Sequence, residues 1–340
     1  MSQIPMDATL TEDQAPPKRR HHRLADNRWQ PGELLLWAMP CLAFFVFEDH
    51  LLLGSQILIT ALFVLSLDLL IGYSGIVSLG HAAFFGTGAY TAGLLATHGW
   101  HEPLSGLLAA CLVAGCLGFI SSFLVVRGHG LTQLVVTLGL GLLLHETANK
   151  AAFITGGVDG LYGIELDMLL GRFEFDFIGK TAYLYSLAVL FICYVLIKRM
   201  LHSPFGLALR GMHEGPDRMP ALGASINRRK TIMFTLSAAI AGLAGALLTH
   251  LTQFVGIDTL SFHRSAEAMI ILILGGTGKL YGSLLGAGCF LVAHDMLSDL
   301  NPAYWQFWIG LLLVLVVLLA KGGMVAVLEG TQRRLFGGRK

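Results

Sequence analysis

Long apolar blocks, separated by short polar segments, set the pattern of elements along this chain. Blocks such as "ELLLWAMPCLAFFVF", "LLLGSQILITALFVLSLDLLI" and "FWIGLLLVLVVLLA" are hydrophobic throughout instead of alternating with polar positions. A helix needs about 20 apolar residues to cross roughly 30 Å of hydrocarbon, and several blocks reach or approach that length. The pattern predicts an all-α, polytopic membrane protein with about ten transmembrane helices.

The predicted transmembrane domain spans residues 33–320 and lies between two polar tails, 1–32 and 321–340. Its crossings are predicted at 33–47, 51–71, 76–98, 103–126, 131–149, 181–199, 231–254, 265–277, 281–298 and 303–320. The longest predicted connections between crossings are an outer loop, 150–180, and an inner loop, 200–230.

Composition and charge agree with a membrane environment and orient the chain in it. The sequence is 54% hydrophobic and 13% charged, whereas soluble domains carry roughly 25% charged residues. All but four of the 23 Lys and Arg residues fall on one side of the predicted crossings. The positive-inside rule therefore places that side, with both termini, in the cytoplasm. Segment 265–277 is short for a crossing, but re-entry would leave the basic C-terminal tail outside, so the sequence favours a crossing.

The head of the chain, residues 1–32, is polar and basic and is predicted to be disordered. It is too polar, and too long before the first apolar block, to resemble a signal peptide. We interpret its basic cluster as a determinant of topology. Binding of this cluster to anionic lipid is the alternative.

No pattern of catalytic, metal-binding or nucleotide-binding residues is present. The five cysteines lie in apolar stretches without a C-x-x-C pair, and the 13 histidines show no metal-ligand spacing. The segment "GGTGKLYG" is not a phosphate loop, because Ile273 replaces its first glycine and Leu280 its final Ser or Thr. The sequence predicts no enzyme activity, no cofactor, no metal and no nucleic-acid partner.

The stretch "GYSGIVSLGHAAFFGTGAY", residues 72–90, brings glycines into an apolar region. Gly72, Gly75 and Gly80 predict a helix break near 72–80, and such a break is tolerated at membrane depth only where protein or a water-filled cavity covers it. Ser78, Ala82 and Gly86 are spaced four apart, which predicts a small-residue face for helix packing. The other small-residue segments are Ala238, Gly242 and Ala246, and the cluster that includes Gly275 and Gly276.

Four polar residues at predicted membrane depth are candidates for a translocation pathway: Asp68, Ser78, His81 and Glu267. Buried acids cost about 2.5–3.5 kcal/mol on insertion scales and commonly mark function. Each candidate has an alternative interpretation. Asp68 could make an interhelical hydrogen bond, and Glu267 could pair with Arg264. The break that contains Ser78, with His81 beside it, could be a tight helix crossing without solute contact.

Four blocks carry a resemblance to a known family: "GYSGIVSLGHAAFFGTGAYTAGLL", "ITGGVDGLYGI", "GLALRGMHEGPDRMPALGASINRRKTIMFTLSAAIAGLAGALLTH" and "RSAEAMIILILGGTGKLYGSLLGA". In order and spacing they resemble the LivM-type permease subunit of branched-chain amino acid ABC importers, over roughly residues 35–325. The resemblance implies a multi-pass protein of the bacterial inner membrane. It also implies a second homologous permease subunit, two cytoplasmic ATPase subunits and a periplasmic solute-binding protein as partners.

The resemblance assigns roles to two loops. "LRGMHEGPDRMPALGAS" matches the segment that docks on the ATPase, with Glu214, Arg218 and Gly223 as coupling candidates, while a merely solvated basic loop is the alternative. Pro216 and Pro220 depart from the uninterrupted helix of many relatives, because proline inside a helix costs about 3 kcal/mol.

The outer block "TGGVDGL" matches a segment on the side where a binding protein would dock. Its candidate docking residues are Thr155, Gly156, Gly157 and Asp159. For Asp159 itself, capping of a short helix is the favoured interpretation.

The function predicted from these features is import of branched-chain amino acids or similar small solutes, driven by separate ATPases. A urea or amide permease of the same superfamily is the near alternative. A stand-alone, ion-coupled secondary transporter would also explain broken helices and acids at membrane depth.

Overall fold

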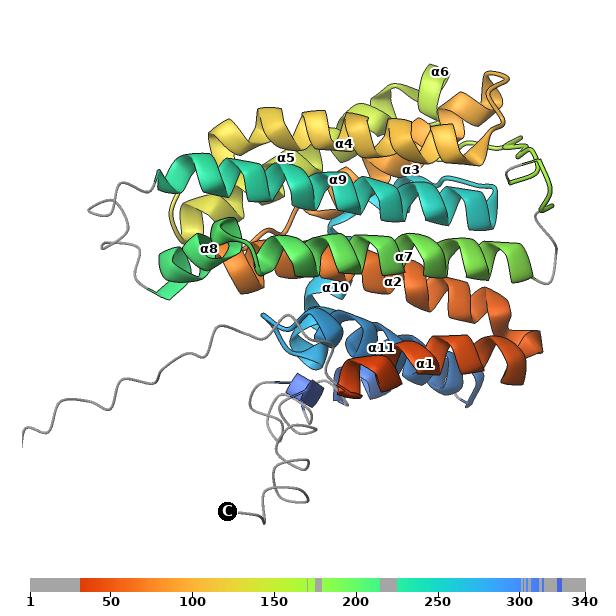
Figure 1. Cartoon of the computed structure of the whole chain (residues 1–340). Helices are drawn as coiled ribbons and strands as arrows, with labels where there is room; N and C mark the ends of the chain where they lie inside the picture. Colours follow the sequence, from red (N-terminus) through yellow and green to blue (C-terminus); the bar gives the residue numbers. More distant parts are fainter. Residues whose placement is uncertain are drawn as a thin grey trace, which may run out of the picture.

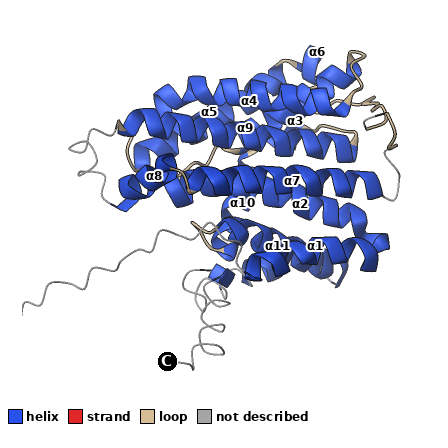
Figure 2. Cartoon of the chain, in the orientation of Figure 1, coloured by secondary structure: helices blue, strands red, loops and turns tan. Residues whose placement is uncertain are grey.

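The computed structural model describes residues 31–169, 171–174, 179–214 and 225–300, together with 302, 304, 307–311, 314 and 323–325. This part of the chain is helical apart from loops and two isolated β-bridges, as Figures 1 and 2 show. The longer elements are α1 (Pro31–Val46), α2 (Leu51–Asp68), α3 (Ala82–Thr97), α4 (Pro103–Val125), α5 (Leu131–Lys150), α7 (Lys180–Leu201), α8 (Pro204–Glu214), α9 (Ile226–Thr252), α10 (Phe262–Gly275) and α11 (Leu280–Leu300). The short ones are η1 (Glu48–His50), η2 (Leu69–Ser74), α6 (Ala152–Thr155) and η4 (Ile257–Leu260).

Within the described residues, six helical segments are long and apolar enough to cross a membrane. They are Glu48–Ser74, Pro103–Val125, Leu131–Lys150, Lys180–Leu201, Ile226–Thr252 and Leu280–Leu300. The predicted all-α membrane class is therefore confirmed. The count of ten crossings and the cytoplasmic termini stay predictions, since α1, α3 and α10 are shorter and most of 303–320 and both tails lie outside the described residues.

α3, α4 and α9 pack closely against one another in the upper part of the fold as drawn in Figure 1. Gly242 of α9 lies directly against Ala114 and the backbone of Ala110 on α4, and Gly88 of α3 lies against the backbone of Gly242. Without a hydrophobic driving force between helices in lipid, such small-residue contacts let van der Waals packing hold helices together. The predicted role of Gly242 in packing thus corresponds to an observed helix crossing.

The helix break predicted near 72–80 is present, with regular helix absent from 75 to 81. α2 passes into the π-helical turn η2, which ends at Gly75 in the left-handed region, φ 67°. Ser78 therefore lies outside any helix, and the predicted helical face of Ser78, Ala82 and Gly86 does not form; α3 begins only at Ala82. Side chains cover the break: Thr137 accepts from the Leu79 N–H (3.2 Å) and Ser265 from the Ala82 N–H (2.8 Å).

Residues 253–275 differ from the short helical crossing predicted at 265–277. From the end of α9 the chain passes through a non-helical stretch, 253–256, and then η4, with Val255 beside Gly93 and Leu260 beside Gly86 of α3. The backbone of Val255 pairs with that of Leu161 (2.9 and 3.3 Å). α10 then continues to a turn at 276–279, where Gly278 lies against Gly72.

Candidate functional site

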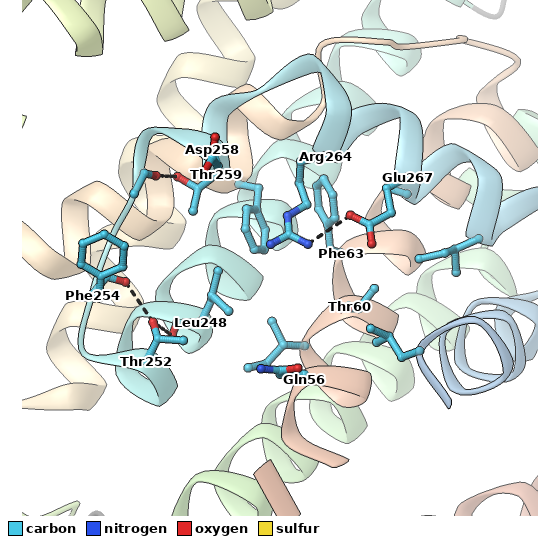
Figure 3. A pocket seen from close by; sticks show the side chains of 16 residues that line it. Gln56, Thr60, Phe63, Leu248, Thr252, Phe254, Asp258, Thr259, Arg264 and Glu267 are labelled. Atoms are coloured by element: carbon cyan, nitrogen blue, oxygen red, sulfur yellow. Dashed lines mark hydrogen bonds and ion pairs between the residues drawn. The ribbon is translucent and has the colours of Figure 1, made fainter. Parts of the chain in front are cut away.

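A cavity of about 290 Å³ lies between α2, α9, η4, α10 and α11. Its apolar wall includes Ile59, Phe63, Phe85, Leu248 and Ile271. Its polar groups come from two sides: Gln56 and Thr60 from α2, and Asp258, Thr259, Arg264 and Glu267 from the segment that follows α9. Figure 3 shows these side chains around one hollow. Cavities with apolar walls and a few convergent polar groups are typical of small-molecule sites.

Glu267 is the single predicted pathway residue that lines this cavity. Its Oε2 accepts a hydrogen bond from Nη1 of Arg264 at 3.1 Å, three residues earlier on α10 (Figure 3). The ion pair that the sequence offered as the alternative for Glu267 is therefore present. The paired side chains still face the cavity. Both line it, and their side chains are 37% exposed for Arg264 and 20% exposed for Glu267.

Asp68 lies at the end of α2 and is completely buried. Its Oδ1 accepts the N–H of Gly278 at 2.7 Å, which ties α2 to the turn between α10 and α11. Its Oδ2 has no partner among the described residues. Asp68 therefore makes a hydrogen bond that links two parts of the helix bundle, in line with the alternative offered for it from the sequence. It does not line the cavity.

His81 and Ser78 are also fully buried, away from the cavity surface. His81 Nε2 lies 2.8 Å from the Ser66 hydroxyl, and the ring stacks on Phe63 at 5.5 Å between centroids. Because Phe63 itself lines the cavity, His81 forms a second layer behind that wall. Ser78 Oγ has no partner within the described residues.

The glycines singled out in the sequence lie at close contacts or turns. Gly72 lies against Gly278, Gly80 against Thr137, Gly86 against Leu260 and Gly275 against Gly282. Gly276 takes φ 110° in the turn after α10, a conformation that side chains disfavour. These positions describe a tightly packed interior, and a route for solute past them stays a prediction.

The outer block 155–161 packs against the segment that borders the cavity. Thr155 donates to the Ala148 carbonyl at 2.6 Å, and its hydroxyl accepts the Gly157 N–H at 3.2 Å. Gly156 follows α6 in the left-handed region. Asp159 is exposed, and no helix starts in the described residues from 160 to 169, so the predicted helix cap is wrong. Docking of a binding protein on this loop stays a prediction.

The predicted coupling loop is described only in its first part. Glu214 is the last residue of α8, and the structure describes neither its side chain nor any part of Arg218, Gly223, Pro216 and Pro220. α8 packs against η2 and α7. Leu209 and Met212 are buried on one side of α8, while Leu207 is 46% exposed.

Reasoning from the sequence missed Gln56, Thr60, Asp258 and Thr259, which line the cavity. Gln56 and Thr60 lie one helical turn apart inside an apolar block, and that spacing was the available signal. Asp258 and Thr259 follow the predicted crossing 231–254 and lie in no predicted helix, so no sequence pattern pointed to them. Within the described residues, no group of three or more His, Cys, Asp or Glu side chains could hold a metal ion.

Comparison with known proteins agrees with this architecture. The family described as "Branched-chain amino acid transport system / permease component" matches residues 51–317. The chain belongs to this family. The branched-chain amino acid transport permease LivM of Salmonella typhimurium is 30% identical over 303 residues, 83% of this chain and 71% of that protein. LivM of Escherichia coli K12 is 30% identical over 282 residues, 77% of this chain and 66% of that protein.

Relatives of this chain differ in the solute that their names give. The autoinducer 2 import system permease LsrC of Enterobacter sp. is 29% identical over 259 residues, 73% of this chain and 71% of that protein. These relatives are transport permeases and not enzymes. No solved structure matches the chain significantly. Family membership therefore gives this chain the class of membrane permease without giving its solute.

Proposed function

We propose that this chain is the membrane-spanning subunit of an ABC importer for branched-chain amino acids or similar small solutes. It would act in the bacterial inner membrane with a second homologous permease subunit, two cytoplasmic ATPase subunits and a periplasmic solute-binding protein. Family membership supports the transport role. Coupling to the ATPases is supported by the position of α8. This amphipathic helix buries one face on η2 and α7 and exposes Leu207 on the other.

The contacts of α8 suggest how movement on the ATPase side would reach the interior. η2 continues directly from α2, and Asp68 joins that junction to the turn after α10. α10 carries Arg264 and Glu267 into the cavity. A displacement of α8 would therefore act on one packed series of elements that ends at the cavity wall, as alternation between two packed states requires.

Affinity purification of the full-length chain from its native membrane tests this proposal. We expect a second polytopic permease and soluble ATPases to accompany it, and vesicles containing the assembly to take up solute only with ATP. Leu207→Asp places a charge on the exposed face of α8, so we expect loss of the ATPases without loss of the permease partner. Joint replacement of Glu214 and Arg218 should have the same effect.

Val158→Asp is the matched control, since Val158 is 77% exposed on the outer loop. This variant should keep the ATPases. Purification of the chain alone, with uptake driven by an ion gradient and unaffected by Leu207→Asp, would instead support a secondary transporter.

A further inference from the structure

The cavity between α2 and α10 combines opposite charges with an apolar wall. Arg264 and Glu267 meet at 3.1 Å on one side, to which Asp258 adds a second acid, and Phe63 and Leu248 lie around the remaining space (Figure 3). Phe85 also lines the cavity. Charged side chains inside membrane proteins are expensive, face cavities or partners, and commonly mark a solute path. A charge pair that opens onto an apolar hollow therefore needs an explanation beyond packing.

Both members of the pair retain hydrogen-bonding capacity toward the cavity. A guanidinium has five N–H donors and a carboxylate about four acceptor sites. In the described part of the chain, one side-chain donor of Arg264 meets one oxygen of Glu267. The guanidinium can still hold a second carboxylate in its fork, and the free Glu267 oxygen can accept from an ammonium group.

The opposite side of the cavity is neutral and mixed in character. Gln56 and Thr60 on α2 supply an amide and a hydroxyl, and Ile59 and Phe63 lie on the same helix. Thr259 lies on the same side as Arg264 and Glu267, and its hydroxyl donates to the Gly256 carbonyl at 2.8 Å. The volume of about 290 Å³ lies near the lower limit of ligand pockets, so one small solute fits and a larger one does not.

We propose that this cavity is a binding site for the zwitterion of an α-amino acid with an apolar side chain. Arg264 holds the carboxylate, Glu267 holds the ammonium group, and the aliphatic body lies against Phe63, Phe85 and Leu248. The two charges of such a solute are joined through one carbon atom, and the charges of Arg264 and Glu267 are adjacent in the same way. Asp258 also lines the cavity and adds a second carboxylate that can accept from the ammonium group. This inference rests on the proposed function for its solute class, and it places specificity in the permease in addition to any binding protein.

Equilibrium binding of radiolabelled L-leucine to the purified full-length chain, with whatever subunits accompany it, tests the site. The competitors share one apolar body: L-leucine, 4-methylvaleric acid without the amine, 3-methylbutylamine without the carboxylate, and the neutral amide isovaleramide. We expect only the zwitterion to compete well. Each compound that lacks a charge should be weaker by about tenfold or more, because a charge-assisted contact is lost.

Variants separate the site from a structural ion pair. Arg264→Gln and Glu267→Gln should each weaken L-leucine binding by about tenfold or more, and Arg264→Lys should fall between, since it keeps the charge without the fork. Lys180→Gln is the matched control. It breaks the ion pair with Glu48 (3.4 Å), which lies outside the cavity, and should leave binding unchanged.

Unchanged L-leucine binding in both Gln variants, with the fold intact by size-exclusion chromatography, would overturn the site while ATP-driven uptake could still support the importer. Equal competition by isovaleramide would also overturn the zwitterion and favour an amide solute. If zwitterion binding needs Arg264 and Glu267 but the chain recruits no ATPase, the binding site would be supported and the proposal of an ABC importer would be overturned.

Discussion

At the scale of single residues, Asp68 is the buried acid whose structural partner is defined. Asp68→Ala removes the acceptor for the partly buried Gly278 N–H and leaves that donor without its partner. We expect a loss of about 1–3 kcal/mol in the free energy of unfolding, seen as a lower melting temperature in detergent. Asp68→Asn keeps a carbonyl acceptor and should lose less.

Ser74→Ala is a control for that measurement, because the Ser74 hydroxyl bonds only the carbonyls of its own turn, Leu69 and Leu70. Its effect should be smaller than that of Asp68→Ala. Equal melting temperatures for wild type and Asp68→Ala would show that the link to Gly278 contributes nothing, and would leave the acid free for a role in transport.

The position of Asp68 also shows what sequence can predict about a site. An acid in an apolar block is visible in the sequence, and its two possible roles follow from the cost of burial. Choosing between them required Gly278, which lies 210 residues further on. Gln56 and Thr60 were missed for a related reason: neutral polar residues in a helix acquire meaning only once the facing elements are in place.

At the scale of elements, the crossing of α4 and α9 depends on the absence of a side chain at Gly242. A Cβ there would lie 2.8 Å from the Ala110 carbonyl oxygen and closer still to Ala114. Gly242→Ala must therefore push the helices apart, at a cost of about 1–3 kcal/mol, measurable as a lower melting temperature in detergent.

Gly139→Ala provides the matched control on α5, where an added Cβ meets nothing within 4 Å among the described residues. There alanine should be neutral or stabilising by about 0.5–1 kcal/mol, because it restricts the unfolded chain and favours helix. If Gly242→Ala melts no lower than Gly139→Ala, close approach of these helices is not what holds the core together.

At the scale of the whole molecule, the path of residues 253–279 decides the topology. Gln253 and Thr277 are both exposed, at opposite ends of this segment, and the predicted orientation puts Gln253 outside and Thr277 inside. In a chain whose five cysteines are replaced by alanine, Gln253→Cys should react with an impermeant maleimide on intact cells. Thr277→Cys should react only in inverted vesicles.

Asp159→Cys and Arg127→Cys serve as outside and inside references for the labelling. Reaction of positions 253 and 277 from the same side would mean that the segment re-enters, and would reverse the predicted position of the C-terminus. Apolar blocks predicted the long helices well, since a membrane span needs little beyond length and composition. They could not predict residues 253–261, because a segment without regular α-helix depends on partners distant in the sequence.

The path of residues 253–275 has a consequence for membrane insertion of the chain. α10 has 14 residues, about 21 Å of helix against roughly 30 Å of hydrocarbon. In the stretch before it, Thr259 and Ser261 make local backbone bonds, but Val255 pairs its backbone with distant Leu161, and Val255 and Leu260 pack on glycines of α3. We therefore expect residues 253–275 to partition into lipid poorly on their own during synthesis, unlike a plain span. Their entry has to follow assembly of the preceding helices, which act as a template for a late, protein-assisted insertion step. A later onset of outside maleimide reactivity at Gln253→Cys than at Asp159→Cys in newly made chains would measure that delay.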